Sequence, residues 1–335
     1  MIGLIAAFLL AMGVTWLTTP LALKLATRFN VMAVPRMRDV HRKTTPRLGG
    51  MAIYLGVILA VVITISYRHV ITHGANGWNQ RFLGVLIAGT FIAILGIIDD
   101  VKDLRAIWQA LGILACGGIL IAFGVRIEGI AHPLLAQQAG VNTGDNWFAL
   151  SMPISIISTL FWVFLVTKTV DAVDGLDGLA AGVCAIAAAT LALLAAASNQ
   201  PEGPSIALFA AAVTGACIGF LRYNFNPARI FMSTIGSQFL GFTLAALSIM
   251  GTFKWAAAIS VAVPILVLGV PIFDYFIVLT RRLLNRAPLT KADRRHFHHR
   301  LMDRGLSQKQ AVYVIYCCTG ILCIAALFIY KYSRW

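Results

Sequence analysis

Residues 82–98 read FLGVLIAGTFIAILGII, and the acidic segment DDVKD at 99–103 follows them directly. The apolar run carries no charged side chain and is close to the length of about 20 residues that an α-helix needs to cross a bilayer. Charged side chains are costly inside a membrane, so their abrupt appearance indicates that the helix ends at the membrane surface. The stretch therefore predicts a membrane-spanning helix that delivers carboxylates to one face of the membrane.

Nine further apolar segments lie elsewhere in the chain. Hydrophobic residues make up 59% of the 335 residues and charged residues only 12%, whereas soluble domains carry about 25% charged residues. This composition excludes an ordinary water-soluble domain. We expect an all-α, polytopic integral membrane protein that forms a single domain over residues 1–335. Its about ten transmembrane helices are predicted at 2–24, 49–66, 82–98, 107–124, 150–166, 178–197, 205–221, 236–252, 256–279 and 311–330.

The basic residues predict the orientation of the chain. Most of the 27 Lys and Arg residues follow the first, third, fifth, seventh and ninth predicted spans. Loops rich in Lys and Arg remain in the cytoplasm. We therefore expect the odd-numbered loops inside, both termini outside, and an active face that is cytoplasmic.

The net charge of +14 does not by itself indicate a nucleic-acid-binding protein. No basic segment is interleaved with aromatic residues, and no known nucleic-acid-binding module is present. Part of the excess is the ordinary topology signal, and part could attract anionic headgroups of the lipid bilayer. Loops that combine basic residues with clustered carboxylates indicate a phosphorylated ligand together with a divalent metal ion.

Asp99 and Asp100 are the first candidate site residues. Two adjacent carboxylates at the end of a helix repel each other unless a cation or a proton lies between them. Mg²⁺ with oxygen ligands is the cation usually found beside phosphates. The alternative is an acidic turn exposed at the membrane interface, since the pattern DDxxD alone is weakly specific.

A second acidic motif reads DAVDGLDG at 171–178, just before the sixth predicted span. If this segment is helical, Asp171, Asp174 and Asp177 fall on one strip of its surface because they are spaced by three. The two glycines of the motif would let a ligand or another backbone approach closely. A solvated helix start is the alternative, but three carboxylates on one strip are costly without a partner.

The last predicted inner loop contains RRHFHHR at 294–300. Its histidines and arginines suit a diphosphate or an anionic nucleotide. Zinc binding and a plain basic surface are competing interpretations, and no Cys accompanies the histidines. Further basic residues lead into the turn PRLGG at 46–50. Asp274 lies within the ninth predicted span, where an acid indicates either a functional role or an ion pair.

Together these motifs resemble the polyprenyl-phosphate N-acetylhexosamine-1-phosphate transferases over nearly the whole chain. Five motifs occur in the order typical of that family: PRLGG at 46–50, DDVKD at 99–103, DGLDGLAAG at 174–182, RYNFNPARIFM at 222–232 and HFHHRL at 296–301. The last of them looks like the branch that primes O-antigen, enterobacterial common antigen or teichoic acid. The related branch that transfers phospho-MurNAc-pentapeptide usually has three consecutive histidines there.

The resemblance implies a fold of ten or eleven helices in the bacterial inner (cytoplasmic) membrane and a reaction that depends on Mg²⁺, with Mn²⁺ as a substitute. The phosphate of undecaprenyl phosphate would attack the β-phosphate of a UDP-N-acetylhexosamine. The donor that we expect is UDP-GlcNAc. UMP would leave, and the lipid-linked sugar would start the synthesis of a cell-envelope glycan. A homodimer is one of the assemblies that such a chain could form.

The resemblance also implies roles for individual residues. Asp99 and Asp100 would position or deprotonate the lipid phosphate, and Asp174 and Asp177 would organise the nucleotide end. The resemblance implies Asp99 and Asp100 as metal ligands, and we expect Asp171 to join them in place of a carboxylate that this sequence lacks elsewhere. The expected substrate-binding residues are Arg47, Lys168, Asn226, His296, His298, His299 and Arg300. The resemblance implies that His298 and His299 would contact the uridine diphosphate.

The sequence departs from the family pattern in two places. Thr234 stands where the family has an aspartate that ligates the metal, and Lys168 and Asp171 stand where it has two asparagines. Asp171 could supply the missing carboxylate. Alternatively, the chain could be a catalytically weakened or inactive relative that binds polyprenyl phosphate or nucleotide sugar. A transporter is a third class, less favoured because nearly every charged residue lies at a predicted helix end.

Overall fold

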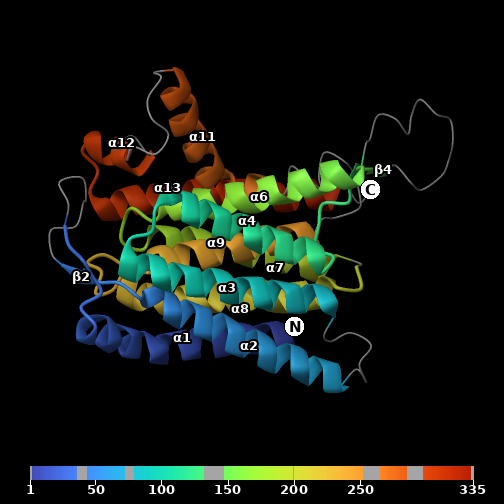
Figure 1. The fold of residues 1–335 in the computed structure, drawn as a ribbon, viewed down its shortest axis with the longest axis horizontal. Coiled ribbons are helices and arrows are strands. Elements are labelled where there is room, and N and C mark those ends of the chain that lie inside the picture. Colours follow the sequence, from blue (N-terminus) through green and yellow to red (C-terminus); the bar gives the residue numbers. More distant parts are fainter. Residues whose placement is uncertain are drawn as a thin grey trace.

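The computed structural model describes residues 2–35, 44–71, 79–131, 147–198, 200–251, 265–284 and 297–332. These residues are mostly helical, and their strands form two short antiparallel pairs, β1–β2 and β3–β4 (Figure 1). The helices are α1 (Ile2–Arg28), α2 (Gly49–Ile71), α3 (Gln80–Lys102), α4 (Ala106–Ala122), α6 (Met152–Val173), α7 (Leu179–Ala197), α8 (Gly203–Asn224), α9 (Ser233–Met250), α11 (Gly269–Leu284), α12 (Phe297–Asp303) and α13 (Gln308–Tyr332). The strands are β1 (Met32–Ala33), β2 (Thr45–Pro46), β3 (Gly129–Ala131) and β4 (Trp147–Ala149).

Eight of the described helices are long and apolar enough to cross a membrane, namely α1, α2, α3, α6, α7, α8, α9 and α13. Each of them overlaps a predicted span, so the all-α, polytopic architecture is confirmed. α4 overlaps the predicted span 107–124 and is also apolar, but it has only 17 residues.

The ninth predicted span, 256–279, is confirmed only in part. Residues 252–264 lie outside the described part of the chain, and α11 begins at Gly269 and continues to Leu284. In Figure 1 this helix rises away from the bundle instead of lying along it. Arg281 and Arg282, which follow the predicted span 256–279, are therefore helical.

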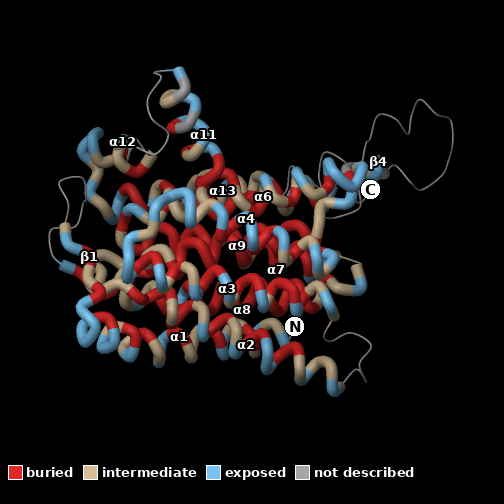
Figure 2. The backbone as a smooth tube through the Cα atoms, viewed as in Figure 1, coloured by how far each residue is buried: buried red, intermediate tan, exposed pale blue. Residues whose placement is uncertain are grey.

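The centre of the bundle is formed by α7, α8 and α9, whose residues are mostly buried, whereas only a minority of the residues of α1 and α13 are buried (Figure 2). Small residues let helices approach closely inside a membrane. A Cβ atom at Gly215 or Gly219 of α8 would lie within 2.1 or 2.5 Å of the carbonyl oxygens of Phe8 and Met12 on α1. The outer helix α1 is therefore fitted against the central helix α8 backbone to backbone.

The two termini lie at one end of the bundle, and the β1–β2 pair and α12 lie at the other (Figure 1). We call the second end the site end, because the segments that carry the acidic and histidine motifs also meet there. The arrangement agrees with the prediction that both termini share one side. Which side of a membrane the site end faces stays a prediction.

Candidate active site

The two acidic motifs meet at the site end of the bundle. Asp99 and Asp100 belong to the last turn of α3, and Asp171 belongs to the last turn of α6. Asp174 directly follows α6 as its C-cap, and Asp177 lies in the turn before α7. The negative charges of Asp100, Asp171 and Asp177 all act on Asp174. Carboxylates from two motifs far apart in the sequence therefore form one acidic cluster.

Asp100 caps the N-terminus of α9. Its carboxylate accepts hydrogen bonds from the Ser233 hydroxyl and from the backbone N–H groups of Thr234 (3.3 Å) and Ile235 (3.4 Å). The unpaired N–H groups and the dipole of a helix stabilise a negative charge at this position. α3 comes close to α9 because residue 96 is a glycine: a Cβ at Gly96 would lie 2.6 Å from the Ile235 Cα.

Asp99 is buried beside Asp100 but has other partners. Its Oδ1 accepts hydrogen bonds from the backbone N–H of Leu104 and from the side-chain amide of Gln109, each at 2.9 Å. Gln109 lies on α4 and was not among the predicted site residues. Its type and spacing give no signal in the sequence, because the contact depends on how the α3–α4 turn folds back.

The PRLGG turn brings Arg47 to the same cluster. A Cβ at Gly50 would lie 2.1 Å from the backbone nitrogen of Gly236, so the turn packs directly on the start of α9. The Arg47 guanidinium lies 3.6 Å from the Asp103 carboxylate, and its positive charge also attracts Asp100. The predicted substrate-binding arginine therefore stands beside the acidic motif.

Lys168 is held inside the site by two neighbours. Its Nζ donates hydrogen bonds to Oδ2 of Asp171 at 2.9 Å and to Oε1 of Gln109 at 2.7 Å. The other oxygen of Asp171, Oδ1, accepts a hydrogen bond from the Ser237 hydroxyl of α9 at 2.7 Å. The prediction that Lys168 binds substrate is untested, but most of its hydrogen-bonding capacity is already used within the protein.

The predicted strip of three helical aspartates is not formed, because α6 ends at Val173. Within the described residues no hydrogen bond reaches the carboxylate of Asp174, the second of the three. Burial, reinforced by the charges of Asp171, Asp100 and Asp177, raises the pKa of this carboxyl from 3.8 to about 8. A carboxyl in such surroundings needs either its proton or a nearby cation.

Asp177 is held by the RYNFNPAR segment. Its Oδ2 accepts hydrogen bonds from the side-chain amide of Asn226 at 2.9 Å and from the backbone N–H of Ala228 at 3.0 Å. Asn224, which was not predicted as a site residue, accepts a hydrogen bond from the backbone N–H of Gly178 at 3.0 Å. Gly178 has a φ of +80°, which favours glycine. Asn226 therefore shapes the acidic turn.

The histidine motif lies over this turn. A Cβ at Gly175 would be 2.7 Å from Nε2 of His298, so only glycine lets the imidazole pack there. The rings of His298 and His299 lie 4.2 Å apart. Asp274 accepts a hydrogen bond from the backbone N–H of Phe297 at 2.7 Å and so anchors the start of α12. Two predicted residues remain: Arg300 is exposed on α12, and His296 lies outside the described residues.

The donor set of the cluster fits a hard divalent cation. Mg²⁺ prefers oxygen ligands, keeps several waters and is usually held by one or two carboxylates plus substrate phosphates. No three His, Cys, Asp or Glu side chains of the described residues are arranged as a complete ligand group. Asp100 and Asp171 use both oxygens in hydrogen bonds within the protein. Asp174, which has no donor in the described structure, and Asp99, which uses Oδ1, are better suited.

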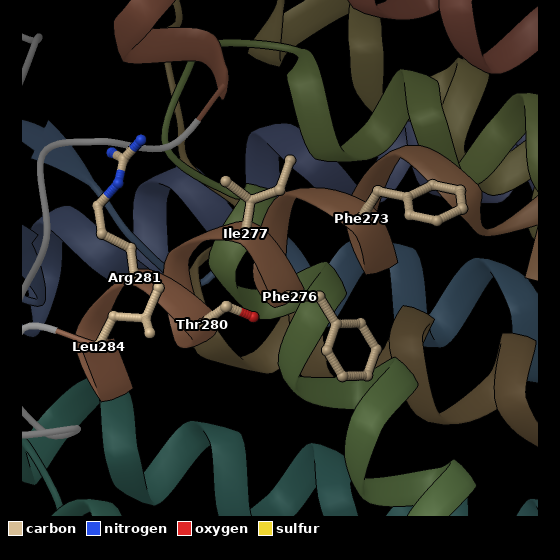
Figure 3. Close-up of a pocket in the computed structure, with 6 residues that line it drawn as sticks. All are labelled: Phe273, Phe276, Ile277, Thr280, Arg281 and Leu284. Carbon is tan, nitrogen blue, oxygen red and sulfur yellow. The ribbon is translucent and has the colours of Figure 1, made fainter.

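A shallow apolar pocket lies apart from the acidic cluster, on α11. None of the acidic site residues lines it, and the side chains that do are Phe273, Phe276, Ile277, Thr280, Arg281 and Leu284 (Figure 3). The two phenylalanines, the isoleucine and the leucine are exposed. In a membrane protein such a surface suits contact with lipid chains. In Figure 3 the guanidinium of Arg281 points away from Phe276.

Comparison with known proteins gives a match to the family described as glycosyl transferase family 4 over residues 82–252. The matched region begins in α3 and ends just after α9. It therefore contains both acidic motifs, Gln109, Lys168 and the capped start of α9.

Full-length relatives are also found. The chain is 33% identical over 335 residues to "Probable undecaprenyl-phosphate N-acetylglucosaminyl 1-phosphate transferase" of Bacillus subtilis (strain 168), covering 100% of this chain and 87% of the relative. It is 33% identical over 342 residues to "Decaprenyl-phosphate N-acetylglucosaminephosphotransferase" of Mycobacterium leprae (strain TN), covering 97% and 82%. It is 32% identical over 295 residues to "Phospho-N-acetylmuramoyl-pentapeptide-transferase" of Synechococcus sp. (strain JA-3-3Ab), covering 84% and 78%.

Proposed function

Because this chain belongs to glycosyl transferase family 4, we propose that it transfers N-acetylglucosamine 1-phosphate from a UDP-sugar to undecaprenyl phosphate and releases UMP. The names of the relatives from Bacillus subtilis and Mycobacterium leprae support this sugar and this class of lipid acceptor. The observation that carries the proposal is the acidic cluster of two motifs, placed at one end of membrane-spanning helices beside Arg47 and the His298–His299 pair.

Phosphoryl transfer depends on positioning the substrates and neutralising their charge more than on covalent participation of the protein. An oxygen of the lipid phosphate attacks the β-phosphorus of the UDP-sugar. A new P–O bond forms, the bond from the β-phosphorus to the bridging oxygen breaks, and UMP leaves. Mg²⁺ held by Asp174 and Asp99 would neutralise phosphate oxygens, and Mn²⁺ could serve in its place.

Different residues around the cluster contact the lipid phosphate and the nucleotide sugar. Asp99, fixed by Gln109, orients the lipid phosphate and accepts its proton. His298, packed over Gly175, and His299 contact the diphosphate of the nucleotide sugar, with Arg47 contributing positive charge. The exposed apolar face of α11 gives the polyprenyl chain a surface in contact with the bilayer.

The orientation follows from the charges of the loops. Basic loops remain cytoplasmic, and the site end carries loops of this kind. We therefore place the active site on the cytoplasmic face of the inner membrane, with both termini outside.

The second candidate function is a non-catalytic relative that binds the same ligands, and one observation favours it. Thr234 stands at the capped start of α9 and gives the acidic cluster no carboxylate there. Asp171, the extra acid of this chain, is paired with Lys168 and therefore adds little net negative charge.

One experiment separates the two functions. Purified protein in lipid nanodiscs is given undecaprenyl phosphate, Mg²⁺ and one radiolabelled UDP-sugar at a time, and UMP and the lipid product are measured. We expect release of UMP with UDP-GlcNAc that requires both the lipid phosphate and the metal and stops on addition of EDTA. Binding of the nucleotide sugar without any UMP release would instead establish the non-catalytic function.

A further inference from the structure

The Lys168 ammonium is enclosed by groups of the active site. It lies 2.9 Å from a carboxylate oxygen of Asp171 and 2.7 Å from the amide oxygen of Gln109. The side chains of Lys168 and Asp171 are only 18% and 23% exposed. A partly buried ion pair with short contacts is screened less by water and salt than a surface pair, so its charge balance matters to the site.

Gln109 connects this ammonium to Asp99. The amide group has one oxygen and one NH₂ end, and its neighbours determine which end faces which. Lys168 can only donate, so the amide oxygen must face it, and the NH₂ end then donates to Oδ1 of Asp99 at 2.9 Å. A change of charge at Lys168 would therefore alter the hydrogen bond that orients Asp99.

The pair is also fixed from its far side. Ser237 of α9 donates to the second oxygen of Asp171 at 2.7 Å. Residues from α3, α4, α6 and α9 thus form one continuous chain of hydrogen bonds that ends at Asp99. The backbone permits this closeness, because a Cβ at Gly241 of α9 would lie 2.8 Å from the Cα of Thr167 on α6.

We infer that Lys168 is an internal cation of the active site, which offsets the charge of Asp171 and positions Asp99 through the amide of Gln109. In this arrangement Lys168 and Asp171 act as a neutral unit. Lys168 is then a positioning residue instead of a substrate ligand, and Asp171 is its counterion instead of a ligand of the divalent cation. The inference rests on the proposed function only for its turnover measurements, since cation binding can be measured in a chain without activity.

Gln109 can be tested through turnover. Gln109→Met removes both hydrogen bonds of the amide, and Gln109→Glu keeps an acceptor for Lys168 but removes the donor to Asp99. We expect both variants to lower kcat by about tenfold, the lower range for loss of a well-placed proton-transfer group, with the KM of either substrate nearly unchanged. Wild-type kcat in Gln109→Glu would overturn the positioning of Asp99 through this amide.

The charge balance is tested by titrating EDTA-stripped protein with MgCl₂ in a calorimeter. Lys168→Met leaves Asp171 without a counterion, so we expect Mg²⁺ to bind about three- to tenfold more tightly. Asp171→Asn leaves the ammonium without a counterion, so we expect binding to weaken by a similar factor. The double variant Lys168→Met/Asp171→Asn removes both charges, and its Kd should return to within about twofold of wild type.

Two control variants accompany this set. Lys168→Arg keeps the positive charge and should bind Mg²⁺ as wild type does. Glu202→Gln removes a carboxylate that pairs with Arg81, outside the acidic cluster, and should leave the Kd unchanged. A double variant that binds Mg²⁺ as weakly as Asp171→Asn would show that Asp171 ligates the ion directly and would overturn the inference. An unchanged Kd in Lys168→Met, or no saturable Mg²⁺ binding by the wild type, would overturn it as well.

Discussion

At the residue scale, Asp174 and Asp177 differ in their surroundings although one DGLDG turn carries both. Asp177 receives two hydrogen bonds from the RYNFNPAR segment, whereas no hydrogen bond reaches Asp174 within the described residues. Hydrogen bonds to the charged form stabilise a carboxylate, and burial without them destabilises it. Asp177 therefore stabilises the fold of the turn. Asp174, by contrast, would need a nearby cation to carry its negative charge.

The raised pKa of Asp174 predicts a dependence of stability on pH. The group has a pKa of about 8 in the fold against 3.8 ordinarily, so the fold favours its protonated form. The stabilisation is fully present below the ordinary value and is lost as the pH rises through about 8. In EDTA, we expect the melting temperature of wild type to fall between pH 5 and pH 8 relative to Asp174→Asn, and Mg²⁺ to reduce the difference.

The control for this measurement is Glu202→Gln, which removes an acid outside the cluster. It should keep the pH profile of the wild type. Identical profiles for wild type and Asp174→Asn would mean that the folded protein does not raise the pKa of this carboxyl.

The adjacent acids of α3 give a second prediction at this scale. We expect Asp99→Asn to lower turnover by at least about a hundredfold, the loss typical of a positioned acid–base group or metal ligand. We expect a loss of similar size in Asp100→Asn, because this carboxylate fixes the start of α9 beside the acidic cluster. At position 99 one asparagine oxygen can accept both hydrogen bonds that Oδ1 now accepts, so the melting temperature should change little. At position 100 both carboxylate oxygens are acceptors, so the asparagine NH₂ would face a donor and some loss of stability is expected there. UMP release together with thermal unfolding checks both statements, and near-normal turnover in both variants would place the reaction elsewhere. Glu128→Gln, an acid outside the cluster, serves as the matched control.

At the scale of elements, the short helix α12 depends on a contact with α11. Asp274 of α11 accepts the backbone N–H of Phe297, the first residue of α12, and the next residue, His298, packs over Gly175. The two helices therefore act together to keep the imidazole over the acidic turn.

This contact predicts a kinetic signature. We expect Asp274→Ala and His298→Ala to raise the KM for the UDP-sugar several-fold and to leave the KM for lipid phosphate nearly unchanged, because α12 faces the anionic soluble substrate. Asp274→Asn keeps an acceptor for the Phe297 N–H and should stay near wild type. Initial rates at varied concentrations of each substrate provide the test. An effect confined to the lipid substrate would contradict the role of this helix.

Individual elements show what the sequence can and cannot predict. Apolar length predicted the eight long helices, because a bilayer sets the length that each must reach. The motifs also led to Asp99, Asp174 and His298. Gln109 and Asn224 were missed, because a single amide side chain gives no pattern and its partners come from other segments. The prediction that three aspartates between 171 and 177 share one face of a helix was wrong, because their spacing does not reveal where α6 ends.

At the scale of the whole molecule, the charge of the loops predicts which end faces the cytoplasm. In a background without the six native cysteines, we expect Lys102→Cys and Arg229→Cys to be protected from an impermeant thiol reagent in intact cells. Gln200→Cys should react. Permeabilised cells, in which all three should react, provide the control. The reverse labelling pattern would remove the basis for a site that uses cytoplasmic nucleotide sugars.

The close fit of α1 on α8 has a consequence for biogenesis. α1 is made before α8, and the two glycines of α8 that receive it, Gly215 and Gly219, are made about two hundred residues later. At about 5–20 residues per second, α1 waits roughly 10–40 seconds in the bilayer before its partner arrives. During this time α1 can pack on α2, where the Thr15 hydroxyl donates to the backbone oxygen of Ala52 at 3.3 Å. The seam between α1 and α8 closes only after most of the chain has been made.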